Sequence, residues 1–276
     1  MRGDAGFPVR VAFTKHGKVR FISHRDVARA FERAFRIEAL PLSFTQGFSP
    51  RPKVSFGLAL SVGHESEAEY LDVELATPIP LGPLPARLTG ALPEGIEVIA
   101  VEPLVDRAPA LQEAVGAVEW EIEVFADVPG LDASPAAIAA RVDIVLAAST
   151  LPVSRQRKGK TTTDDIRPAI RWMRVLGAAH RGVERGSGHA EDAVENVLGP
   201  AEHLHLAGPA SGTGTLIGAE LATRPTSLRP AELIAVLGPH LHEGRVRRIR
   251  QWIERDGERH DPLVVDARIA DEARAS

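Results

Sequence analysis

The chain has 276 residues, 44% hydrophobic and 25% charged, with a net charge of −4, as is typical of a globular protein with room for two domains of about 100–150 residues. No stretch approaches the roughly 18 apolar residues of a membrane span, and residues 1–10 lack the apolar segment of a signal peptide, so we expect a soluble, cytoplasmic protein. The absence of cysteine excludes disulfides and an iron–sulfur cluster held by this chain alone, and the ten histidines form no carboxylate-supported metal motif, so we expect no cofactor or metal.

The first half of the chain carries strand and helix signals in the order β-α-β-β-α-β. Alternation of apolar residues indicates strands, and apolar residues three and four apart indicate helices. We expect strands over 9–14, 19–22, 42–44, 54–61, 69–75 and 95–102, and helices over 24–38 and 83–92. These elements predict a ferredoxin-like domain over residues 1–103.

The helix over 24–38 has the clearest signals. Ser23 precedes it as an N-cap, and Asp26 completes a capping-box pattern. Steps of 100° predict an apolar side made by Val27, Ala30, Phe31, Ala34, Phe35 and Ile37. The same steps predict a stripe on the opposite side, facing solvent, made by Arg25, Arg29, Arg33 and Arg36.

The segment TQGFSPRPK (45–53) follows as an irregular loop, because Gly47 permits positive φ and its two prolines fix the chain and remove donors. Gln46, Arg51 and Lys53 supply donors that suit phosphate or carboxylate. Two interpretations stay open for the stripe and the loop. They form an anion-binding surface, or they form a solvated face beside a rigid turn.

The pattern RFISHRDVxRAFxRAxR, followed by LPxSxTQGFSPRPKxSFGxALxVGxESExEYLDVEL, resembles the radical SAM-linked (radical SAM-associated) protein family, a domain of unknown function. In some genomes such a domain is fused to, or encoded beside, a cobalamin-binding radical SAM protein. The resemblance extends more weakly through 157–168 and 245–262. It implies a radical SAM protein as partner, on which the iron–sulfur cluster and S-adenosylmethionine would reside.

After a predicted linker at 103–116, the second half of the chain again carries strand and helix signals typical of a ferredoxin-like domain. We expect strands over 117–126, 151–157, 161–165, 202–207, 213–222 and 245–253, and helices over 134–147 and 230–238, with 169–176 open to either assignment. The stretch 182–200 is glycine-rich and acidic and predicts a variable loop. We therefore predict an α+β protein of tandem ferredoxin-like domains, the second over 117–262, with a poorly ordered tail at 263–276.

The charges are segregated along the chain. Residues 1–60 hold 11 Lys or Arg against 4 Asp or Glu, residues 61–150 hold 3 against 16, and residues 151–185 hold 9 against 3. A last arginine cluster lies at 245–255. These three basic islands would form a positive groove for a polyanion if they converge in space. In the acidic region, Glu65, Glu67 and Glu69 share a strand face that could hold a cation, but we expect it to face solvent.

We predict an accessory protein that binds structured RNA, such as tRNA or rRNA, and presents it to a radical SAM modifying enzyme. The predicted anion-binding residues are Arg20, Arg25, Arg29, Arg33, Gln46, Arg51, Lys53, Arg157, Lys158, Lys160, Arg167, Arg247 and Arg250. One alternative is a protein–protein adaptor for the radical SAM enzyme without RNA. Another is a metal-independent endoribonuclease resembling the RAMP-type enzymes, with His24 as acid or base. We favour a role without catalysis.

Overall fold

The computed structural model describes residues 6–104, 109–157, 160–180, 213–255 and 258–263. Its strands are β1 (Phe7–Lys15), β2 (Val54–Phe56), β3 (Glu65–Leu75), β4 (Ile96–Pro103), β5 (Val115–Ala126), β6 (Pro152–Arg157), β7 (Lys160–Asp165), β8 (Ile170–His180), β9 (Thr213–Ala222), β10 (Leu241–Arg255) and β11 (Glu258–His260). Its α-helices are α1 (His24–Ile37), α2 (Leu84–Ala91), α3 (Leu111–Ala114), α4 (Pro135–Ala147) and α5 (Pro230–Leu237), and two 3₁₀ turns are η1 (Gly17–Phe21) and η2 (Arg167–Ala169). No helix in these ranges has both the length and the apolar character of a membrane span.

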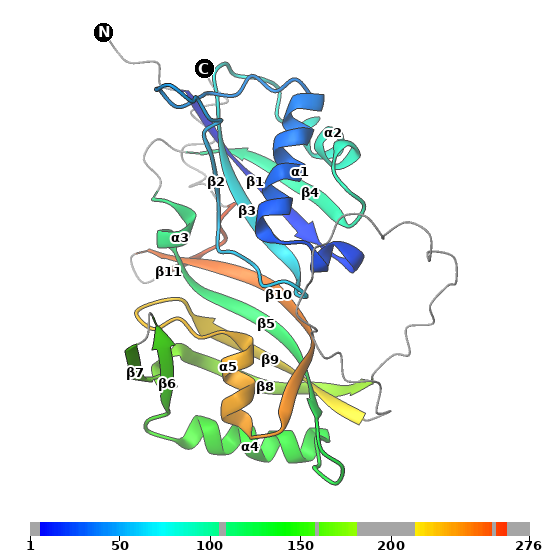
Figure 1. Cartoon of the computed structure of the whole chain (residues 1–276), viewed down its shortest axis with the longest axis vertical. Coiled ribbons are helices and arrows are strands. Elements are labelled where there is room, and N and C mark those ends of the chain that lie inside the picture. The colour runs from blue at the N-terminus through cyan, green and yellow to red at the C-terminus, as the bar shows by residue number, and fades with distance from the viewer. Residues whose placement is uncertain (1–5, 105–108, 158–159, 181–212, 256–257, 264–276) are drawn as a thin grey trace.

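One mixed sheet runs through the molecule in the order β4-β1-β3-β10-β5-β9-β8, with β2 beside β3 and β11 beside β10. Neighbouring strands are antiparallel except β3 and β10, which pair in parallel through Glu65 with Arg247 and Ser66 with Arg248. Figure 1 shows α1 and α2 over one end of the sheet and α4 and α5 over the other. The predicted α+β class is confirmed.

The two halves of the sheet have the same connectivity. In the N-terminal half, from β1 to β4, the last strand lies beside the first, and the third lies between the first and β2. The C-terminal half, from β5 to β10, repeats this order as β10-β5-β9-β8, with the β6–β7 hairpin inserted after α4. We interpret each half as a β-α-β-β-α-β unit. The domain boundaries at 103 and 117 stay a prediction, because the sheet continues across them.

Each half has its own hydrophobic core between sheet and helices. Phe31 and Phe35 of α1 pack with Leu71 of β3 in the first core. Ile138 of α4 and Leu233 of α5 pack in the second, against apolar side chains of β5 and β9. The apolar side predicted for the helix over 24–38 is therefore the face that α1 buries against the sheet.

Several predicted elements differ in extent. The strand predicted over 54–61 ends at Phe56, because the carbonyls of Leu58 and Ala59 accept hydrogen bonds from Arg248 instead of a neighbouring strand. Residues 42–44 make only isolated bridges, of which one joins Leu42 to Leu75. The strand predicted over 19–22 is wrong, because the 3₁₀ turn η1 (Gly17–Phe21) occupies most of this segment. The strand predicted over 245–253 begins at Leu241 and ends at Arg255.

The structure decides three further predictions, whereas others concern segments outside the described residues. The 169–176 segment is strand, as part of β8. The predicted linker contains α3, whose Leu111 is buried. Ile37 is 53% exposed rather than packed, because it ends α1 beyond the buried stripe. The predicted strand at 202–207, the loop at 182–200 and all but the first residue of the tail at 263–276 lie outside the described residues.

Candidate anion-binding surface

Helix α1 begins at a complete capping box. The hydroxyl of Ser23 accepts a hydrogen bond from the backbone N–H of Asp26, and the Asp26 carboxylate accepts one from the backbone N–H of Ser23. The Ser23 hydroxyl also donates to that carboxylate at 2.6 Å, and this bond lowers the pKa of Asp26. The predicted cap is confirmed, and it fixes the residue at which the helix begins.

The outward side of α1 carries four arginines, Arg25, Arg29, Arg33 and Arg36, which we call the α1 arginine face. All four are exposed. Arg29 pairs with Asp26 one turn earlier, at 3.2 Å. The other three make no ion pair or hydrogen bond with any side chain of the described residues, so their guanidinium groups are available to a ligand.

Two hydrogen bonds join the two ends of the loop that follows α1. The backbone N–H of Thr45 donates to the carbonyl of Arg51 at 2.9 Å, and the backbone N–H of Arg51 donates to the Thr45 hydroxyl at 3.0 Å. Gln46 and the Arg51 side chain are exposed at this loop. Lys53, at its base, is partly neutralised by Glu74, which lies 2.7 Å away. The loop thus adds one unpaired guanidinium, that of Arg51, to the N-terminal half.

Most arginines of the third basic island, at 245–255, form ion pairs within the molecule. Arg247 pairs with Glu67 at 3.2 Å and with Glu121 at 2.5 Å. Arg248 is buried and donates to Glu69 at 2.7 Å. Arg250 stays exposed, with its guanidinium over the ring of Trp252. Arg247 therefore joins the two halves of the sheet, and it is not presented as a lone cation.

The same pairing corrects the expectation for the acidic strand face. Glu65 and Glu69 are only 6% and 7% exposed, whereas we expected them to face solvent. Both lie where β3 meets β10, so arginines of the third island compensate their charges. No three metal-ligating side chains of the described residues lie close enough to hold a metal ion.

The second basic island lies in the C-terminal half. Arg157 and Lys160 are paired positions in the backbone register of the β6–β7 hairpin, and Lys158 lies outside the described residues. Arg167 donates to the carbonyls of Leu146 and Ile170, so it closes the end of α4. Figure 1 places the β6–β7 hairpin and α1 in opposite halves of the molecule. The second basic island thus lies apart from the α1 arginine face.

Beneath the start of α1 lies a small cavity with room for about one water molecule. His24, Lys15, Glu69 and Tyr70 line it. Burial lowers the pKa of Lys15 and raises that of Tyr70. The ring of His24 packs edge-on against Phe56, with centroids 5.2 Å apart.

Arg20, which was predicted to bind an anion, pairs with Glu65 at 3.4 Å and stacks over the ring of Phe21. It is therefore part of the junction around β3.

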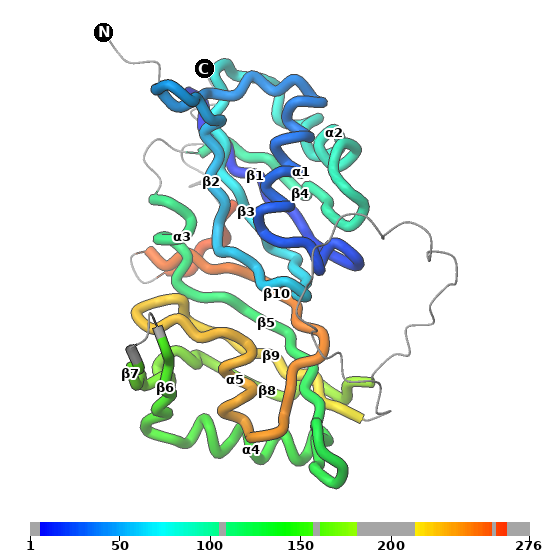
Figure 2. The backbone as a smooth tube through the Cα atoms, viewed as in Figure 1, coloured from blue at the N-terminus to red at the C-terminus, as the bar shows by residue number. Residues whose placement is uncertain are grey.

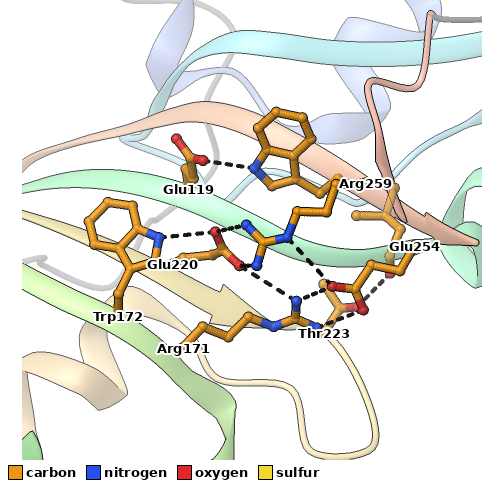
Figure 3. A network of polar contacts seen from close by, with 9 residues as sticks. Glu119, Arg171, Trp172, Glu220, Thr223, Glu254 and Arg259 are labelled. Atoms are coloured by element: carbon orange, nitrogen blue, oxygen red, sulfur yellow. Dashed lines mark hydrogen bonds and ion pairs between the residues drawn. The ribbon is translucent and has the colours of Figure 1, made fainter. Parts of the chain in front are cut away.

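A second polar network, in the C-terminal half, has no counterpart in the sequence-based predictions (Figure 3). Glu220 has no exposed surface, and both its oxygens accept hydrogen bonds from Arg259, at 2.7 and 2.9 Å. The ring N–H of Trp172 donates to the same carboxylate at 3.0 Å. Arg171 lies between Glu220 and Glu254. This network connects β11 to β9 and β8. Its interacting residues are far apart in the sequence, so the contacts can be predicted only if the order of the strands is known.

Comparisons with known proteins identify a family but no activity. The model of a family described as "Uncharacterized protein conserved in bacteria (DUF2344)" matches residues 9–196. No curated protein matches the chain. Among solved structures, a chain of a "Crystal Structure of a Cbf5-Nop10-Gar1 Complex" matches with a TM-score of 0.40 and 9% identity, over 88% of this chain and 48% of that one. This chain therefore spans about half the length of that neighbour.

Proposed function

Since the chain belongs to the DUF2344 family of uncharacterized proteins conserved in bacteria, we propose from its own residues that it binds structured RNA, with the α1 arginine face as the phosphate-contacting surface. The observation that carries this proposal is the lack of partners for Arg25, Arg33 and Arg36, on a helix whose opposite, apolar side is packed in the core. Elsewhere in the described residues, many arginines are used in pairs such as Arg10 with Asp72 and Arg87 with Glu38.

The geometry of the face suits a phosphate backbone. Residues 25, 29, 33 and 36 follow one side of a helix, each four or three positions from the next, so their guanidinium groups succeed one another about one turn apart. A guanidinium binds phosphate with two parallel hydrogen bonds. Phosphate contacts of this kind supply affinity that falls steeply with salt and carry little sequence information.

We further propose that the bound RNA, a tRNA or rRNA, is presented to a radical SAM enzyme. The motif resemblance of residues 20–75 is the support for this partner. The chain has no cysteine, so an iron–sulfur cluster and its S-adenosylmethionine would belong to that partner. In this proposal the chain itself supplies affinity and orientation, and the partner performs the modification.

The test is a titration of a labelled tRNA transcript with the purified protein at several salt concentrations. The variant Arg25→Glu/Arg33→Glu should bind roughly 10- to 100-fold more weakly at about 0.1 M salt, and its log–log salt slope should fall by about 1.4–1.8, since each phosphate contact contributes about 0.7–0.9. The control Arg224→Glu/Arg255→Glu makes the same change of charge at two exposed arginines of the C-terminal half.

Equal losses in the variant and its control would mean that only net charge matters, and would refute a defined surface. A wild-type protein that binds no RNA, but is recovered with a radical SAM protein from native lysate after nuclease treatment, would establish the adaptor instead. A radical SAM protein recovered only with RNA, and lost in the double variant, would support presentation.

A further inference from the structure

We propose that Phe48, at the tip of the loop after α1, stacks on an unpaired base of the bound RNA. The inference rests on the proposed function and adds a second kind of contact to it. Phe48 is fully exposed, whereas Phe31 and Phe35 of α1 are fully buried. Burying a phenylalanine side chain removes apolar surface from water and stabilises a protein. The fold gains none of this at Phe48.

The loop holds Phe48 away from the core. Residues 45 and 51 are joined by the two hydrogen bonds of Thr45 and Arg51, and a β-bridge joins Phe44 to Pro52 just below them. Gly47 has a φ of 131°, a conformation open to glycine, and Pro50 fixes the backbone on the other side of the tip. An aromatic ring on such a closed loop loses less conformational entropy on binding than one on an open loop.

The surroundings of Phe48 favour a nucleotide over an apolar pocket of a protein partner. Residues 39–53 contain no Asp or Glu, and they contain Arg51 and Lys53, of which Lys53 is paired with Glu74. Arg51 is exposed without a side-chain partner in the described residues, so it is available to the phosphate next to a stacked base. Aromatic side chains beside cations are the usual combination in sites for single-stranded nucleic acid.

The proposal specifies the part of the RNA that is bound. Bases inside a duplex are already stacked, and a single phenylalanine at a loop tip does not displace them. Bases of a hairpin loop, a bulge or a single-stranded end present their faces. We therefore infer that the α1 arginine face contacts the phosphates of a paired stem, and that Phe48 contacts an unpaired base that lies next to it.

The test compares two labelled RNAs, a hairpin with an unpaired loop and a blunt duplex with the same stem. Phe48→Ala should lower the affinity for the hairpin about 10-fold, since stacking of one base on an aromatic residue contributes roughly 1–3 kcal/mol. It should leave the affinity for the duplex and both salt slopes unchanged. Phe48→Trp should restore hairpin binding, and 2-aminopurine in the RNA loop should be quenched by the wild-type protein and less by Phe48→Ala.

The control is Ile144→Ala, which removes an apolar side chain that is 71% exposed on α4 of the C-terminal half. It should bind both RNAs as the wild type does. Unchanged hairpin affinity in Phe48→Ala, with binding still lost in Arg25→Glu/Arg33→Glu, would overturn this inference and keep the proposed function. Full binding by Phe48→Leu would also overturn stacking, because leucine is apolar but has no aromatic face.

Discussion

Glu220 is a buried carboxylate, and both of its oxygens accept hydrogen bonds. Arg259 binds both of them, and Trp172 donates to one. A buried charge that loses its partners is strongly destabilising, whereas a compensated one contributes little net stability. Glu220 therefore acts as the anchor to which β11 and the edge strand β8 are fixed.

We predict that Glu220→Ala lowers the free energy of unfolding by about 1–3 kcal/mol, because it leaves the ring N–H of Trp172 without its acceptor. Arg259 loses its partner too, but its side chain is 45% exposed, so water can hydrate the freed guanidinium. Urea unfolding followed by tryptophan fluorescence measures the loss. Glu258→Gln is the control, since the Glu258 side chain is 81% exposed and its loss should change stability by less than about 0.5 kcal/mol. A loss below about 1 kcal/mol in Glu220→Ala would show that the network relaxes around the missing group.

The sequence predicts residues whose partners are local and misses those whose partners are distant. Ser23 and Asp26 are three positions apart, so a capping pattern reveals them. Glu69 and Arg248 are 179 positions apart, and their contact depends on which strands become neighbours. For this reason the α1 arginines were placed correctly on an exposed face, while the burial of Glu65 and Glu69 was not predicted.

At the scale of the element, the cap of α1 holds the first turn, which carries Arg25. We predict that Ser23→Ala lowers the free energy of unfolding by about 1 kcal/mol, the usual loss for an N-cap hydroxyl. Ser23→Thr, which keeps an acceptor oxygen, should lose much less. RNA affinity should fall slightly in Ser23→Ala if fraying of the first turn reaches Arg25. Identical stability of the two variants would mean that the hydroxyl does not cap the helix.

The cap also has a pH dependence of known sign. The hydrogen bond from Ser23 lowers the pKa of Asp26 in the folded protein. A carboxyl whose pKa is lower folded than unfolded stabilises the fold above the unfolded pKa, near 3.9, and this contribution is lost as the pH falls through the folded value. NMR titration should show the Asp26 pKa moving up toward its ordinary value in Ser23→Ala. An unmoved pKa would contradict the assignment of the cause.

Elements are predicted well where packing and local pattern agree. The bounds of α1 and α4 match their expected ranges to within one residue, since both begin at a serine N-cap and bury an apolar stripe. The segment 54–61 has a strand pattern, yet only its first residues pair with β3. Its later carbonyls bind the guanidinium of Arg248, a use of the backbone that periodicity does not reveal.

At the scale of the molecule, the two halves are joined through the contact between β3 and β10. Only two residue pairs make this parallel ladder, and Arg248 with Glu69 lies on it as a buried ion pair. Figure 2 shows the orange strand β10 passing between β3 and β5. The C-terminal segment returns to the first half as well, because Tyr70 donates to Asp261 and Arg10 donates to the carbonyl of Pro262.

We predict that Arg248→Met and Glu69→Leu each lower the free energy of unfolding by about 3–5 kcal/mol, because each leaves an uncompensated charge at a nearly dry site. The double variant should lose less than the sum of the two, with a coupling energy of roughly 1–3 kcal/mol in the cycle. Calorimetry or urea unfolding provides the four values. Strict additivity would show that the two residues stabilise the halves independently.

The distribution of the basic islands is also a property of the whole molecule. Their charges can be counted from the sequence, but their use depends on the sheet order, which brings the arginines of β10 against the glutamates of β3 and β5. Strand order follows from side-chain packing and connection geometry over long separations, and one sequence gives little information on it. The sequence alone therefore could not predict whether the three basic islands form one groove. It could predict the exposed arginine side of the helix, because that depends only on local spacing.

The parallel contact of β3 with β10 has a consequence for the order in which the chain is made. Glu69 leaves the ribosome 179 residues before Arg248, an interval of roughly 10–40 s at the usual rates of synthesis. During that time one end of β3 has no neighbour on the side of β10, and an unpaired strand edge favours association with other chains. The carboxylates of Glu65 and Glu69 remain hydrated meanwhile, so the nascent edge is charged, and charge at a strand edge opposes aggregation. The glutamates that later hold the halves together would thus first protect the unfinished protein.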